Sequence, residues 1–165
     1  MQDAVDELIA HLRTTRELSL MLERVYRFHK TNPQVLDFLV DEMRVDRANG
    51  WDKVSLGSLW HHARWVLTRK IRLPGECFAM SNNLFPTYGR IIAILHPDLN
   101  GYFKMSTCAI DYDLDVKLET AGNHPRGYTR RLLWADGTAI ENGWRPSVPH
   151  EPKTVRRRKP VEREA

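Results

Sequence analysis

The spacing of apolar residues between positions 55 and 69 limits what this chain can fold into more than any other feature. Six apolar residues recur there at helical intervals, which places all of them on one face: Leu56, Leu59, Trp60, Ala63, Val66 and Leu67. Ser55 is positioned to cap this helix. The opposite face carries five residues, one of them a large aromatic on an otherwise polar side: Ser58, His61, His62, Trp65 and Arg69.

An earlier helix is predicted over residues 33–49. Asn32 and Pro33 indicate its start, because Pro at the first helical position gives up no hydrogen bond. Asn49 and Gly50 indicate its end. Its buried stripe is formed by five apolar residues: Val35, Leu36, Leu39, Val40 and Met43.

The segment after the second helix predicts a β-hairpin over residues 70–80, with Pro74 and Gly75 at its turn. Helix, short turn, helix and hairpin is the chain order of a winged helix-turn-helix. In that arrangement the second helix enters the major groove and the hairpin contacts the flanking backbone. The exposed face of helix 55–69 would then contact DNA. The alternative is an ordinary helical bundle whose outer face happens to be basic.

Charge is distributed unevenly along the chain, which favours a phosphate-binding surface near this helix. Residues 53–92 contain six basic residues and one acidic residue, whereas residues 1–52 contain seven basic and ten acidic residues. A local basic surface binds a phosphate backbone better than an average charge does. Three cations are predicted to neutralise phosphates: Lys53, Lys70 and Arg72. A basic cluster in the tail binds polyanions or serves as a solubilising end: Arg156, Arg157, Arg158 and Lys159.

Two further helical regions flank this central part. At the N-terminus, Thr14 with Glu17 forms a capping-box pattern, so a second helix is predicted to begin there. A single bent helix over residues 3–29 is the alternative. Later, Asn82 and Asn83 are predicted to cap an amphipathic helix that ends at His96-Pro97, with five residues inward: Leu84, Tyr88, Ile91, Ile92 and Leu95.

The last third of the chain is predicted to be rich in strands. Apolar and charged residues alternate over positions 110–119, which indicates a half-buried strand. Residues 128–135 and 138–144 are predicted to pair around Asp136 and Gly137. A Pro-rich and charged tail follows, which should not fold alone.

The sequence contains only weak indications of a metal-binding or catalytic site. Asp111, Asp113 and Asp115 would share one strand face, and such carboxylates hold Mg²⁺ in nucleases, although a solvated polar face explains the alternation equally well. His61 and His62 point about 100° apart on a helix, so no metal site is predicted there. No nucleophile elbow, phosphate loop or dinucleotide-binding pattern occurs, and we predict no catalytic residue and no cofactor.

The apolar runs, the N-terminal residues and the number of cysteines indicate where in the cell the protein is located. The apolar runs are too short to span a membrane, and the acidic N-terminus lacks the order of a secretory signal. Cys77 and Cys108 are too few for a disulfide framework and are predicted to be reduced and partly buried. We therefore expect a cytoplasmic protein without membrane contact.

Residues 28–102 resemble small, uncharacterised proteins of bacteriophages and actinobacterial mobile elements. The resemblance rests on five short motifs: Asn32-Pro33, Trp60 with Ala63-Arg64-Trp65, Asn82-Asn83, Pro86-x-Tyr88-Gly89-Arg90 and His96-Pro97. It covers under half of the chain and implies a phage or mobile-element origin, but it implies no activity.

The sequence therefore predicts an α+β protein in three parts: a helical domain with a winged-helix-like unit over 1–104, a small antiparallel β region over 105–148, and a basic tail over 149–165. The expected function is DNA binding as a phage or mobile-element regulator in a bacterial cytoplasm. The alternative is a phage-encoded interaction module that binds and inhibits a host protein, and a metal-dependent nuclease is the third possibility. The oligomeric state is left open.

Overall fold

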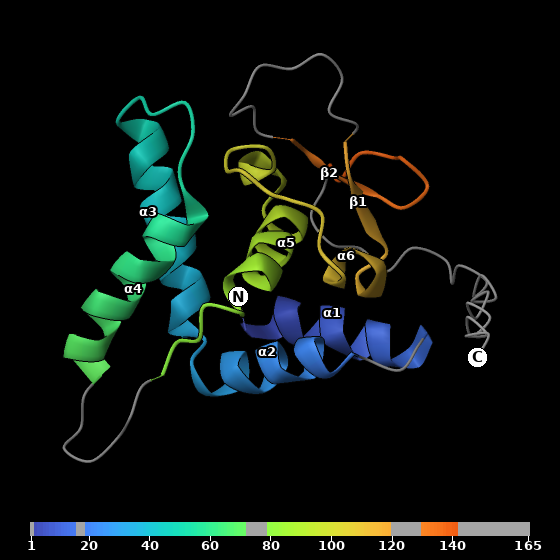
Figure 1. The fold of residues 1–165 in the computed structure, drawn as a ribbon, viewed down its shortest axis with the longest axis horizontal. Coiled ribbons are helices and arrows are strands. Elements are labelled where there is room, and N and C mark those ends of the chain that lie inside the picture. Colours follow the sequence, from blue (N-terminus) through green and yellow to red (C-terminus); the bar gives the residue numbers. More distant parts are fainter. Residues whose placement is uncertain (1, 16–18, 72–78, 120–129, 142–165) are drawn as a thin grey trace, which may run out of the picture.

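The computed structural model describes residues 2–15, 19–71, 79–119 and 130–141. Over these ranges the chain is mostly helical, with a small two-stranded antiparallel sheet near its C-terminal end (Figure 1). The elements in chain order are α1 Gln2–Thr15, α2 Leu20–Thr31, α3 Gln34–Ala48, α4 Leu56–Ile71, α5 Phe85–Leu95, the 3-10 helix η1 Pro97–Leu99, α6 Ile110–Asp113, β1 Val116–Leu118 and β2 Leu132–Trp134. The sequence predicted this order, in which helices are followed by a small antiparallel sheet.

The N-terminal segment forms two helices, α1 and α2, which lie side by side and run in opposite directions (Figure 1). The predicted start at Thr14 is wrong, because Thr14 belongs to the last turn of α1. Ser19 caps α2 instead, and its hydroxyl accepts a hydrogen bond from the Leu22 amide at 3.2 Å. An ion pair of 3.0 Å between Arg13 and Glu23 joins the two helices.

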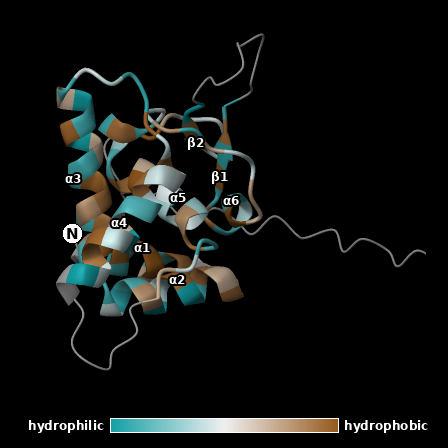
Figure 2. Ribbon diagram, turned by 60° about the vertical axis from the view of Figure 1, so that its left-hand side comes forward, coloured by the Kyte–Doolittle hydropathy of each residue, from teal (hydrophilic) through white to brown (hydrophobic). Residues whose placement is uncertain are grey.

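The most apolar helix, α5, occupies the centre of the structure. It contacts α1, α2, α3, α4, η1 and β2, and residues 87–94 are all buried. α5 is buried on both of its faces, so it is not the amphipathic helix that the sequence predicted, and it is mostly apolar apart from Arg90. By contrast, α2 and α3 alternate between hydrophilic and hydrophobic faces (Figure 2). The predicted cap at Asn82-Asn83 is wrong, because Leu84 directly precedes the first turn of α5. The predicted end at His96-Pro97 is confirmed.

Helices α3 and α4 pack along each other (Figure 1). Pro33, not Asn32, precedes the first turn of α3, and the Asn32 side chain donates to the Phe28 carbonyl at the end of α2. The predicted end of α3 at Asn49-Gly50 is confirmed, with Gly50 at a φ of +87°.

The start of α4 is also as predicted, since the Ser55 hydroxyl accepts a hydrogen bond from the Ser58 amide at 3.3 Å. However, α4 continues through Lys70 and Ile71, so these residues do not begin a strand. Most of the predicted hairpin, residues 72–78, lies outside the described residues, and residues 79–80 form no strand. The helix pair is therefore present, but no winged helix-turn-helix is identified in the described part of the chain.

The predicted strand over residues 110–119 is wrong in its first half, which forms the single helical turn α6. The Asp111 carboxylate accepts a hydrogen bond from the Cys108 amide at 2.8 Å, and such a local bond stabilises a helical turn against a strand. Asp115, at a φ of +55°, links α6 to β1. Cys108 is exposed, not partly buried as predicted.

The sheet pairs β1 with β2, with Val116 opposite Trp134 and Leu118 opposite Leu132. The predicted hairpin around Asp136 and Gly137 is confirmed only as an isolated antiparallel bridge between Leu133 and Ala139. Residues 128–129 and 142–144 of that hairpin, and the tail, lie outside the described residues.

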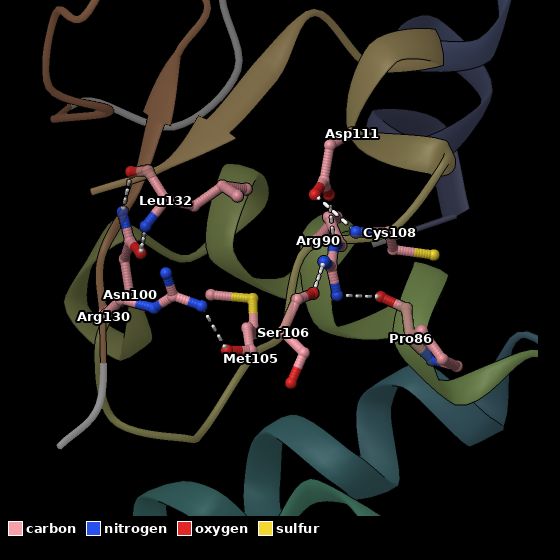
Figure 3. A network of polar contacts seen from close by, with 9 residues as sticks. All are labelled: Pro86, Arg90, Asn100, Met105, Ser106, Cys108, Asp111, Arg130 and Leu132. Atoms are coloured by element: carbon pink, nitrogen blue, oxygen red, sulfur yellow. Dashed lines mark hydrogen bonds and ion pairs between the residues drawn. The ribbon is translucent and has the colours of Figure 1, made fainter. Parts of the chain in front are cut away.

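A buried ion pair joins α5 to α6 (Figure 3). Arg90 is 2% exposed, and its Nε donates to Asp111 Oδ1 at 2.7 Å. The two terminal nitrogens donate to the backbone carbonyls of Pro86 and Ser106. Arg90 is one of the six basic residues between positions 53 and 92, but its charge is neutralised in the interior and does not contribute to the surface.

We predict that Asp111→Ala lowers the free energy of unfolding by about 3–5 kcal/mol, because the buried Arg90 charge loses its partner. The neighbouring Asp113→Ala should change it by less than about 1 kcal/mol. Urea unfolding followed by circular dichroism measures both. Equal effects of the two substitutions would contradict the structural role of Asp111.

His29 makes stability depend on pH. It is buried, its Nδ1 lies 3.4 Å from the Tyr88 hydroxyl, and its Nε2 has no hydrogen-bond partner in the described structure. Desolvation lowers the pKa of His29 from 6.5, and the N-terminal charge adds a smaller lowering, while Asp6 and Asp37 act in the opposite direction. The unfolded chain therefore binds a proton more readily than the folded chain, so stability is fully present above pH 6.5 and is lost as the pH falls below it.

We therefore expect the unfolding temperature of the native protein to fall between about pH 7.5 and about pH 5.5. His29→Asn should show a smaller fall over the same interval. Part of the fall should persist, because burial also lowers the pKa of His96. An unchanged pH dependence in His29→Asn would show that His29 does not titrate as described.

Candidate binding surface on α4

The buried and exposed faces of α4 are those that the sequence predicted. Five of the six apolar residues are buried and Val66 is half-buried. Trp60 is 0% exposed, whereas Trp65 is 57% exposed. The other predicted residues of the outer face are also exposed: Ser58, His61, His62 and Arg69.

Four side chains on this outer face form a continuous row across α3 and α4, which we call the Trp65 row: Phe38, His62, Trp65 and Arg69. The ring centroids of Phe38 and His62 are 5.7 Å apart, and those of His62 and Trp65 are 6.4 Å apart in a stacked geometry. The Arg69 guanidinium carbon lies 4.1 Å from the centroid of the Trp65 ring. The row therefore presents an aromatic face and a cation together at the surface.

The Arg69–Trp65 contact orients a charged group without neutralising it. A guanidinium that stacks on an indole keeps its N–H groups directed outward in the plane of the guanidinium. Phosphate and carboxylate groups both bind such an edge through paired hydrogen bonds. The row can therefore bind an anionic partner that also offers a planar or apolar surface to Trp65.

The described cations of residues 53–92 differ in how far they reach the surface around the row. Lys53 and Arg69 are exposed, but the Arg64 guanidinium donates to the Asn82 side chain and Arg90 is internal. The side chain of Lys70, together with Arg72 and the tail cluster Arg156, Arg157, Arg158 and Lys159, lies outside the described residues.

Two residues of α3 near this surface were not predicted from the sequence. Phe38 contacts His62, and Glu42 Oε2 lies 3.9 Å from His62 Nε2. Phe38 and Glu42 are four residues apart on α3, so the helical period puts them on one face. If the contact between α3 and α4 had been predicted, this spacing would have identified Phe38 and Glu42 as neighbours of His62.

The carboxylates that suggested a magnesium site do not share a face. Asp111 lies in α6 and is bound to Arg90, while Asp115 lies in the turn before β1. Among the described residues, no group of three or more His, Cys, Asp or Glu side chains could hold a metal ion. The geometric basis of the nuclease hypothesis is therefore absent from this part of the chain.

No helix in the described ranges is long and apolar enough to cross a membrane. Comparisons of the chain with models of protein families, with curated proteins and with solved structures found no match.

We predict opposite effects of alanine at the two tryptophans of α4. Trp60→Ala should lower the free energy of unfolding by about 3–5 kcal/mol, because it leaves a cavity against Tyr88 and Phe85. Trp65→Ala should cost less than about 1 kcal/mol, since the contacts it removes, with Arg69 and His62, lie at the surface. Chemical unfolding of the two variants tests this, and a large loss of stability in Trp65→Ala would contradict the assignment of the outer face.

Proposed function

We propose that this protein binds DNA through the outer face of α4 and acts as a regulator in a bacterial cytoplasm. The observation that carries the proposal is the exposed Trp65 ring with the Arg69 guanidinium stacked on it. Stacking orders the Arg69 side chain before any partner arrives, which lowers the entropic cost of binding. The free edge of the Arg69 guanidinium suits a pair of phosphate oxygens, and the part of the Trp65 ring that His62 and Arg69 leave exposed suits a sugar or base surface.

The start of α4 adds to this surface. Ser58 lies in the first turn of the helix and Lys53 lies in the connection before it. The N-terminus of a helix favours anions, because its first amide groups lack partners inside the helix and the helix dipole is positive there. Phosphate contacts at Lys53 and Ser58 would set the position of α4 on the duplex.

We also propose that the protein derives from a bacteriophage or a mobile element, as the resemblance over residues 28–102 implies. A DNA-binding regulator encoded by such an element is consistent with the α4 surface. The tail cations 156–159 would contribute phosphate contacts that do not depend on sequence.

A second candidate function is binding to a host protein, and one observation favours it. Glu42 lies beside His62, and Asp41 is exposed on the same helix. Carboxylates at this position repel a phosphate backbone but are compatible with a protein partner. An exposed Trp with an adjacent Arg is also the composition of an interface hot spot.

The test compares variants of the row with matched controls. Trp65→Ala and Arg69→Gln should each weaken binding to a fluorescent duplex by about 5-fold or more, since base or sugar stacking and one phosphate contact are lost. Tyr112→Ala replaces an equally prominent aromatic on α6, and Arg24→Gln replaces an exposed cation on α2. Both controls should bind as the native protein does.

Ionic strength separates the two candidates. If DNA is the partner, the association constant should fall steeply between about 50 and about 200 mM salt, with a smaller slope in Arg69→Gln. If both row variants bind duplex normally while capture of a host protein is lost in Trp65→Ala, the DNA proposal is wrong and the protein-binding candidate replaces it.

A further inference from the structure

A cleft of about 510 Å³ opens at the C-terminal end of α3, away from the Trp65 row. Its walls come from three separate segments of the chain. The end of α3 and the following loop supply Arg47, Trp51 and Asp52. The η1 region supplies Asp98 and Tyr102, and Arg131 lies directly before β2.

Hydrogen bonds inside the fold hold these walls in place. The Tyr102 hydroxyl donates to the Trp51 carbonyl at 3.0 Å, and the Arg47 guanidinium donates to the Asp98 carbonyl. Desolvation raises the pKa of Tyr102 above its ordinary value, and Asp46 and Asp52 raise it further against the opposing effect of Arg47, so the phenol remains a donor.

The third wall is fixed by a buried amide. The Asn100 side chain donates to the Leu132 carbonyl and accepts from the Leu132 amide, both at 2.8 Å (Figure 3). This pair anchors the residue next to Arg131. A Cβ atom at Gly101 would lie 3.0 Å from the Arg131 Cγ, so the absence of a side chain there leaves room for Arg131 to lie against the loop. The cleft is therefore built before any ligand enters.

Two side chains of this rigid cleft have no partner in the described structure. The Trp51 indole is 65% exposed and makes no ring contact or hydrogen bond with another described residue. The Arg131 guanidinium is exposed and likewise forms no hydrogen bond or ion pair within the described ranges. An indole face and a guanidinium fork are thus both available at a concave site.

The mixed charge of the lining narrows the ligand class. The negative charge of Asp98 is balanced by Arg44, whose Nε lies 3.7 Å from its carboxylate. The remaining charges of the lining are the positive charges of Arg47 and Arg131 and the negative charge of Asp52. A simple inorganic anion would use neither the indole nor the carboxylate. A nucleoside phosphate uses all three kinds of group, because its base stacks on an indole, its phosphate binds guanidinium groups, and its hydroxyl or amino groups donate to a carboxylate. Its size also suits the volume of the cleft.

We propose that this cleft binds a nucleoside phosphate, with the base on Trp51, the phosphate at Arg131 and Arg47, and Asp52 accepting from a hydroxyl or amino group. The ligand is either a free mononucleotide or the terminal nucleotide of a nucleic acid, since both offer the same chemistry. The proposal does not rest on the function assigned to α4, because the cleft and the Trp65 row share no residue.

The test titrates the full-length protein with 5′-AMP and 5′-GMP by isothermal calorimetry, with adenosine, guanosine and inorganic phosphate as comparison probes. At least one mononucleotide should bind, and its nucleoside and phosphate alone should each bind about 10-fold more weakly or not at all. Trp51→Ala and Arg131→Gln should each weaken the mononucleotide by about 10-fold. Tyr112→Ala and Arg24→Gln are the matched controls and should bind normally.

A short single strand with a 5′-phosphate distinguishes the two sources of the ligand. If this strand binds, with loss in Trp51→Ala, and the mononucleotides do not, the cleft takes the end of a nucleic acid. If neither mononucleotide nor strand binds, or if both bind equally well to Trp51→Ala and Arg131→Gln, the proposal is overturned. Both substitutions are at exposed positions, and circular dichroism verifies that the variants are folded.

Discussion

The buried charge of Arg90 is the constraint on which the arrangement of the C-terminal part depends. An isolated guanidinium in the interior would cost several kcal/mol, so each of its donors must find an acceptor. Those acceptors come from α5 itself, from the loop at Ser106 and from Asp111 in α6. The ion pair can form only if α6 is held against the central helix. The turn from α6 into β1 then brings the sheet next to α5, which β2 contacts.

Packing on the other side of α5 determines which face of α4 reaches solvent. The centroid of the Trp60 ring lies 5.2 Å from that of Tyr88 and 6.4 Å from that of Phe85, both in α5. It lies 6.5 Å from the ring centroid of Phe28 in α2. These contacts with three aromatic rings, two from α5 and one from α2, fix the rotation of α4 about its own axis. A residue five positions later on a helix lies about 140° away, so Trp65 must face outward. The exposure of the Trp65 row is thus a consequence of the burial of Trp60.

The sequence was most informative where structure depends on local spacing. The faces of α4 and the ends of α3 and α5 were predicted because helical periodicity and stop signals are visible within one segment. It failed where a distant partner decides the outcome. Residues 110–119 alternate as a strand does, but Asp111 accepts from the nearby Cys108 amide and also binds Arg90, twenty-one residues earlier. The same ion pair removed Arg90 from the basic surface that the charge count suggested. The cleft could not be predicted, because three separate segments build it.

The most direct test of the central claim follows the indole N–H signals of the five tryptophans by NMR while a DNA duplex is added. Assignment by single Trp→Phe substitutions identifies Trp60 and Trp65. If the outer face of α4 is the DNA-binding surface, the Trp65 signal should shift in proportion to the bound fraction, and raised salt should reverse the shift. The signal of the buried Trp60 should stay in place. A duplex that binds while the Trp65 signal remains unchanged would contradict the account.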